Sequence, residues 1–91
     1  AWDQPALGAF QASEDAGRGS EGSVITGIDA SPQARDAISA GGNFEASIAQ
    51  DFAGIGSTAA DVVARLLAGE TLRESVIYVP TQLVTSANAA E

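Results

Sequence analysis

Apolar residues recur along this chain at two spacings, and these spacings predict an alternation of helices and strands. Three stretches show the helical spacing and four short runs are rich in β-prone residues. Helices are expected over 6–16, 32–40 and 52–68, strands over 23–28 and 44–49, further extended segments over 76–79 and 83–85, and a frayed tail over 86–91. Alternation of this kind is typical of an α/β fold, so we expect a three-layer parallel sheet with flanking helices.

The stretch from Val24 to Pro32 suggests where a ligand would bind. A buried strand is expected to end at Ile28, Asp29 follows it, and Ser31-Pro32 forms a helix start. Ligands of open α/β sheets bind at the carboxyl ends of the strands, and a carboxylate there accepts hydrogen bonds from ligand hydroxyls. Asp29 is therefore a candidate binding residue. The alternative is that Asp29 only helps to cap the following helix.

Composition excludes several functions. The 91 residues carry a net charge of −8, with four Arg and no Lys, which disfavours partners such as nucleic acid and anionic membrane surfaces. Without Cys there are no disulfides or thiolate metal sites, and without His the commonest general base and metal ligand is missing. No catalytic group, metal or cofactor is expected. The start at Ala1-Trp2-Asp3 suggests a processed or cut product whose preceding strand lies elsewhere.

Five short segments, in this order and spacing, resemble the C-terminal third of the sugar-binding proteins of bacterial ABC importers. The resemblance covers residues 1 to about 88, and no single segment is specific alone. The segments are Ala6–Phe10, Ile25–Pro32, Ala46–Gln50, Leu66–Glu70 and Leu83–Thr85. The resemblance implies the C-terminal part of a two-lobe fold of the periplasmic-binding-protein type.

The resemblance also implies roles for particular residues. In such receptors, residues matching Asp29 and Gln50 hydrogen-bond the sugar hydroxyls, the glutamine from the hinge between the lobes. The turn matching Trp2-Asp3 usually holds Asn-Asp, and the Asn contacts the sugar. Trp2 departs from this pattern: it would stack on an apolar sugar face while Asp3 supplies a polar contact. Alternatively, Trp2 packs within the lobe and Asp3 caps the helix.

By the same resemblance, residues 1–50 belong to the C-terminal lobe, 51–79 to the N-terminal lobe, and 80–91 to the return crossing and tail. The expected function is binding of a monosaccharide or polyol in the periplasm, with a membrane permease and the missing N-terminal part of the same protein as partners. The alternatives are the effector-binding domain of a LacI-type transcription regulator and a fragment with no ligand of its own. The 91 residues alone are not expected to form a stable, ligand-competent monomer.

Overall fold

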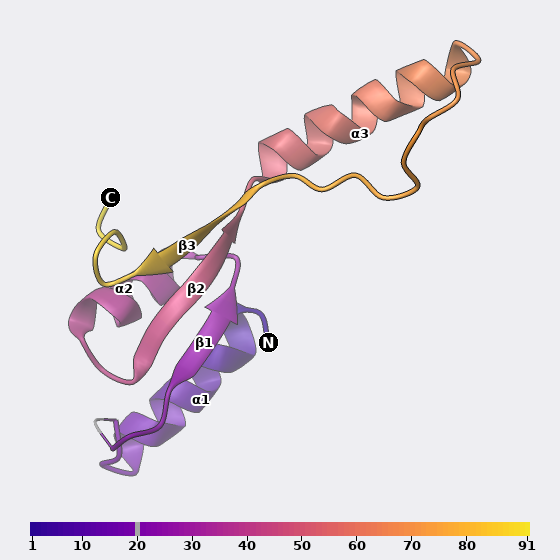
Figure 1. The fold of residues 1–91 in the computed structure, drawn as a ribbon. Coiled ribbons are helices and arrows are strands. Elements are labelled where there is room, and N and C mark those ends of the chain that lie inside the picture. Colours follow the sequence, from indigo (N-terminus) through magenta and orange to yellow (C-terminus); the bar gives the residue numbers. More distant parts are fainter. Residues whose placement is uncertain (20) are drawn as a thin grey trace. The chain divides into compact units, whose positions relative to one another are not determined.

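The computed structural model describes residues 1–19 and 21–91; residue 20, within the expected loop at 19–22, lies outside the description. The observed order of elements confirms the predicted alternation (Figure 1). The elements are α1 (Asp3–Asp15), β1 (Ile25–Ile28), α2 (Pro32–Ala40), β2 (Phe44–Gln50), α3 (Phe52–Leu67) and β3 (Thr81–Thr85). They fall into two compact units: a sheet unit, residues 1–50 and 82–91, and a helix unit, residues 51–81.

The sheet has the order β1-β2-β3. β1 and β2 are parallel, with Ile25 opposite Phe44 and Ile28 opposite Ile48, as the sequence predicts for 23–28 and 44–49. β3 runs antiparallel to β2, so the sheet is mixed and the all-parallel expectation is wrong for this strand (Figure 1). The chain leaves the sheet at the carboxyl end of β2 and re-enters it at the same end. A parallel strand would instead require a crossover that carries the chain back to the opposite end of the sheet.

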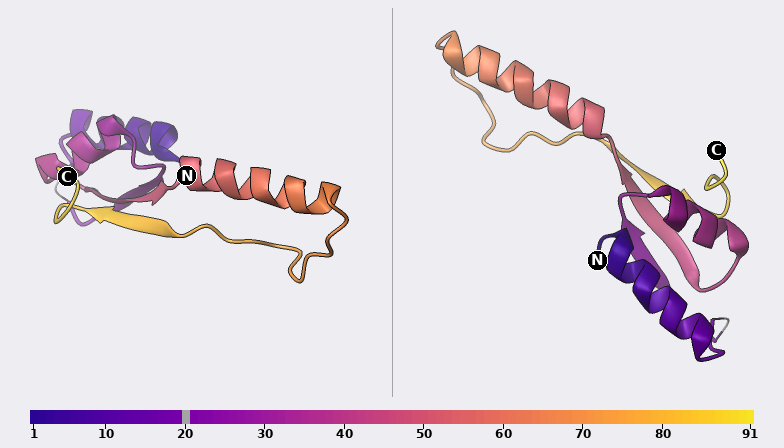
Figure 2. Two further views of the ribbon diagram at one scale, coloured as in Figure 1. Left: turned by 90° about the horizontal axis from the view of Figure 1, so that it is seen from above. Right: turned by 180° about the vertical axis from the view of Figure 1, so that it is seen from behind.

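Helices α1 and α2 lie on one face of the sheet and contact each other, α1 packing mainly on β1 and α2 on β2 (Figure 2). The predicted α/β class, a sheet with flanking helices, is confirmed. The described sheet unit contains two of the three expected layers, because the third helix, α3, belongs to the helix unit. The β1–α2–β2 connection is a crossover between parallel strands, for which the right-handed form is the rule.

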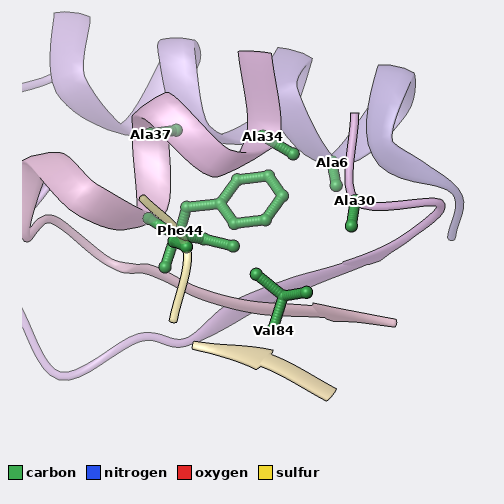
Figure 3. Packing of buried hydrophobic residues seen from close by; sticks show 8 residues of the cluster. Ala6, Ala30, Ala34, Ala37, Phe44 and Val84 are labelled. Carbon is green, nitrogen blue, oxygen red and sulfur yellow. The ribbon is translucent and has the colours of Figure 1, made fainter. Parts of the chain in front are cut away.

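The core of the sheet unit lies between the two helices and the sheet (Figure 3). Phe44 is its largest fully buried side chain, and the ring of Phe10 meets it edge-to-face with centroids 6.1 Å apart. The other buried apolar residues are mostly alanines: Ala6, Ala30, Ala34, Ala37, Ile38, Val84 and Ala89. Ala89 shows that the tail is packed and not frayed as expected; Asn88 Oδ1 also accepts the Thr85 N–H at 2.8 Å.

The helix unit buries none of the residues of α3. Asp51 caps this helix by accepting the Gly54 N–H at 2.9 Å, yet Phe52, Val63 and Leu66 are each more than half exposed. The strand predicted over 76–79 is not formed, because the described part of the helix unit offers no other strand to pair with. None of the helices in the described residues is long and apolar enough to cross a membrane.

Candidate functional site

Asp29 and Gln50 meet at one edge of the sheet. Asp29 directly follows β1, and Gln50 is the last residue of β2. These two strands are parallel neighbours, so their carboxyl ends lie at the same edge of the sheet. Gln50 Nε2 donates a hydrogen bond to Asp29 Oδ1 at 2.7 Å, and both residues are partly exposed. The predicted proximity of these two residues is confirmed.

The backbone of the turn that carries Asp29 has an unusual conformation. Asp29 has a φ of 112° and Ala30 a φ of 52°, and no other non-glycine residue in the described chain has a positive φ. For residues with a Cβ this region is sparsely populated, and each such residue costs about 1–3 kcal/mol. The surrounding structure must therefore hold this turn in place.

Three hydrogen bonds tie down the backbone of the turn. The Asp29 N–H donates to the Ile48 carbonyl at 2.7 Å, and the Ala30 N–H donates to Ser47 Oγ at 3.0 Å. From the other side, Arg35 Nε donates to the Ala30 carbonyl at 3.1 Å. The turn is thus fixed by β2 on one side and by α2 on the other.

Asp3 lies beneath the same turn. It is 2% exposed; its Oδ1 accepts the Ser47 hydroxyl and its Oδ2 the Ser31 N–H, both at 2.7 Å. With both carboxylate oxygens engaged and buried, we do not propose Asp3 as a ligand contact. Nor does it cap α1, because it is the first residue of the helix.

Trp2 occupies the position before α1 and is 61% exposed. It makes no side-chain hydrogen bond to the helix end. The next residue, Asp3, accepts a hydrogen bond from the Ser31 N–H, so the backbone of Trp2 lies close to the turn that carries Asp29. Within the described residues the indole is thus largely exposed, and its stacking on a ligand stays a prediction.

The sequence pattern alone missed Ser47 and Gly27. Strict alternation places Ser47 on the polar face of its strand. In the structure Ile25 pairs with Phe44 and Thr26 with Ala46, so β2 has one extra residue, Glu45, at this point. This bulge turns Ser47 to the buried face. At Gly27 a Cβ would collide with Asp3 Oδ1 and lie 3.2 Å from the Phe44 ring. A glycine inside a β-prone run is the signal that marks such a close approach.

The fold and the site thus define an α/β protein that carries a hydrogen-bonded acid–amide pair at the carboxyl edge of its parallel strands. The chain belongs to the periplasmic binding protein domain family, whose model matches residues 1–71.

Several relatives match nearly the whole chain. The "Putative rhizopine-binding protein" of Rhizobium meliloti is 44% identical over 89 residues, which are 98% of this chain and 28% of that protein. An ABC transporter solute binding protein from Agrobacterium vitis, solved with bound allitol, is 36% identical over 99% of this chain, with a TM-score of 0.84. One from Bacillus halodurans with bound myo-inositol is 34% identical over 98%, with a TM-score of 0.73. The chain covers 30% of each of these two structures.

Proposed function

We propose that this chain forms the C-terminal part of the solute-binding component of a bacterial ABC importer, and that its ligand is a polyol or sugar. The observation that carries the proposal is the hydrogen-bonded pair of Asp29 and Gln50 on a rigidly held turn. Two solved relatives hold bound allitol and bound myo-inositol, which are neutral polyhydroxylated molecules. Binding, and not catalysis, is the proposed activity.

The chemistry of the pair suits a ligand with adjacent hydroxyls. With Oδ1 accepting from Gln50, Asp29 keeps Oδ2 as an acceptor, while Gln50 keeps its second N–H as a donor and Oε1 as an acceptor. A hydroxyl both donates and accepts, so two neighbouring hydroxyls of one polyol satisfy these atoms together. Trp2, if it stacks on the ligand, adds an apolar contact to the carbon face of the same molecule.

The two units suggest how the ligand is enclosed. We assign residues 1–50 to the C-terminal lobe, 51–79 to the N-terminal lobe and 80–91 to the return crossing and tail; the division of the chain after Gln50 and after Thr81 supports this assignment. Gln50 then lies at the hinge, where closure of two lobes around a ligand is a recurrent device. The closed protein would deliver the polyol to a membrane permease from the periplasm.

Calorimetric titration tests the proposal on the full polypeptide that the gene encodes. Allitol, myo-inositol and glycerol are the probes, and saturable binding of at least one is expected. Replacing Asp29 with Ala removes a charged acceptor and is expected to weaken that binding by about 1.5–3 kcal/mol. Asp36→Ala, at an exposed carboxylate on α2, is the matched control and should bind as the unaltered protein does. Equal affinity for Asp29→Ala would remove Asp29 from the site.

Transport is tested separately in cells. Uptake of the labelled polyol should fall when the gene is deleted and return with the intact gene, but not with the Asp29→Ala variant. Normal uptake in the deletion strain, together with changed transcription of a neighbouring operon, would instead support a regulatory function.

A further inference from the structure

We propose that Ser47 and Asp3 are positioning residues, which hold the Asp29–Ala30 turn so that the Asp29 carboxylate stays on Gln50. The inference rests on the proposed role of Asp29 as a ligand contact. Ser47 and Asp3 are 1% and 2% exposed, so neither is placed to contact a ligand. Their effect on binding would be transmitted through the backbone of the turn.

Ser47 links the Asp3 carboxylate to the backbone of the turn through two hydrogen bonds of its hydroxyl. The Ser47 hydroxyl has a single proton, which it donates to Asp3 Oδ1. The lone pairs of Ser47 Oγ then face the Ala30 N–H, which donates to it at 3.0 Å. Oδ2 of the same carboxylate accepts the Ser31 N–H. One buried carboxylate thus fixes two consecutive residues of the turn.

The conformation of the turn explains why this fixing matters for the ligand contact. Left-handed backbone at Ala30, with a φ of 52°, is disfavoured for a residue with a Cβ and persists only where its surroundings demand it. If the turn relaxes, the Asp29 side chain leaves its 2.7 Å contact with Gln50. Glycine adopts left-handed backbone freely, so Ala30→Gly should make the turn less dependent on Ser47.

Four variants of the full polypeptide test the proposal: Ser47→Ala, Ala30→Gly, the double variant of both, and Ser13→Ala. Ser13→Ala is the matched control, because its hydroxyl accepts from Asn43 Nδ2 at 3.0 Å and so joins α1 to the start of β2, away from the turn. The measurements are polyol affinity, thermal stability and the NMR signals of the Gln50 side-chain amide. The last of these reports the contact with Asp29 without any ligand.

Ser47→Ala is expected to lower polyol affinity about tenfold, the equivalent of one net hydrogen bond, and to shift the Gln50 amide signals. The double variant should recover most of the affinity and the original signals. Ser13→Ala should lower the melting temperature while leaving the affinity and the Gln50 signals unchanged. Loss of stability in Ser47→Ala with unchanged affinity and unchanged Gln50 signals would overturn the proposal.

Two further outcomes are informative. If Ser47→Ala does not fold, Asp3→Asn takes its place, since an amide keeps the shape but offers one acceptor where the carboxylate offers two; unchanged Gln50 signals in Asp3→Asn would then refute the proposal. If no polyol binds the unaltered protein, the proposed function fails, whereas the positioning role is still judged by the Gln50 signals. The two failures are therefore distinguishable.

Discussion

At the scale of single residues, the smallest side chain determines how closely helix and strand approach. Gly27 on β1 faces Asp3 at the start of α1, and the absent Cβ is what allows the Asp3 carboxylate to reach Ser47 and Ser31. The same glycine borders the Phe44 ring in the core. One position therefore couples the packing of the sheet unit to the turn that carries Asp29.

Gly27→Ala is expected to destabilise the protein by about 1–3 kcal/mol, because the added methyl group must displace Asp3 or move α1 from the sheet. Gly8→Ala is the matched control: it lies within α1, where an added Cβ meets nothing within 4 Å. Alanine is the better helix former, so this change should stabilise by about 0.5–1 kcal/mol. Thermal denaturation of both variants measures the contrast, and equal melting temperatures would contradict the close approach.

The charge of Asp29 predicts selectivity between ligands of the same size. In the proposed site a neutral polyol would place a hydroxyl against the Asp29 carboxylate, whereas a sugar acid that binds with its carboxylate there would bring two negative charges together. The net charge of −8 on these 91 residues adds to this repulsion. Competitive titration should show a polyol binding more tightly than the aldonate of equal chain length. A preference for the aldonate would argue against the proposed contact.

At the scale of elements, local signals in the sequence predicted most boundaries. Ser31 and Pro32 mark the start of α2, and Gly41, with a φ of 81°, ends it. The parallel pairing of β1 with β2 also followed from the spacing. The direction of β3, the extra residue in β2 and the burial of Asp3 did not follow, because each depends on residues far apart in the chain. The run 76–79 has strand propensity, but a strand also needs a partner, which propensity does not supply.

The cap of α2 gives a prediction at this scale. Ser31 Oγ accepts the Ala34 N–H at 3.2 Å, so Ser31→Ala should cost about 0.5–2 kcal/mol of stability. Ser39→Ala, at an exposed position in the same helix, is the control and should be neutral or stabilising by up to about 0.5 kcal/mol. Chemical denaturation measures both. A cost for Ser39→Ala as large as that for Ser31→Ala would show that the cap contributes nothing specific.

At the scale of the whole molecule, the sheet unit buries a core whereas α3 buries nothing. The helix has a stripe of apolar residues at helical spacing: Phe52, Ile55, Ala59, Val62, Val63 and Leu66. The chain spans only about 30% of the length of its solved relatives. Each large apolar side chain that stays exposed forgoes about 1.5–3 kcal/mol of burial free energy. Several such side chains together amount to a large part of the usual stability of a domain, about 5–15 kcal/mol. The stripe therefore requires a covering surface.

The 91-residue chain on its own is expected to self-associate through this stripe. Leu66→Glu, which places a charge in the stripe, should reduce the association measured by analytical ultracentrifugation. Ala64→Glu adds the same charge at an exposed position of α3 outside the stripe, and should leave the association nearly unchanged. A compact monomer that melts cooperatively and binds a polyol would contradict this prediction.

Because β2 and β3 are antiparallel neighbours, the way in which the helix unit is joined to the sheet unit is tolerant of change. The chain leaves the sheet unit after Gln50 and re-enters it at Gln82, on adjacent strands of opposite direction. Antiparallel neighbours are the strands that a two-residue hairpin is able to join. The helix unit is thus an insertion between the two arms of a β-hairpin. Insertions and deletions within 52–80 would leave the register of the remaining sheet intact, so that the helix unit can change in length while the sheet unit, which carries both Asp29 and Gln50, keeps its geometry.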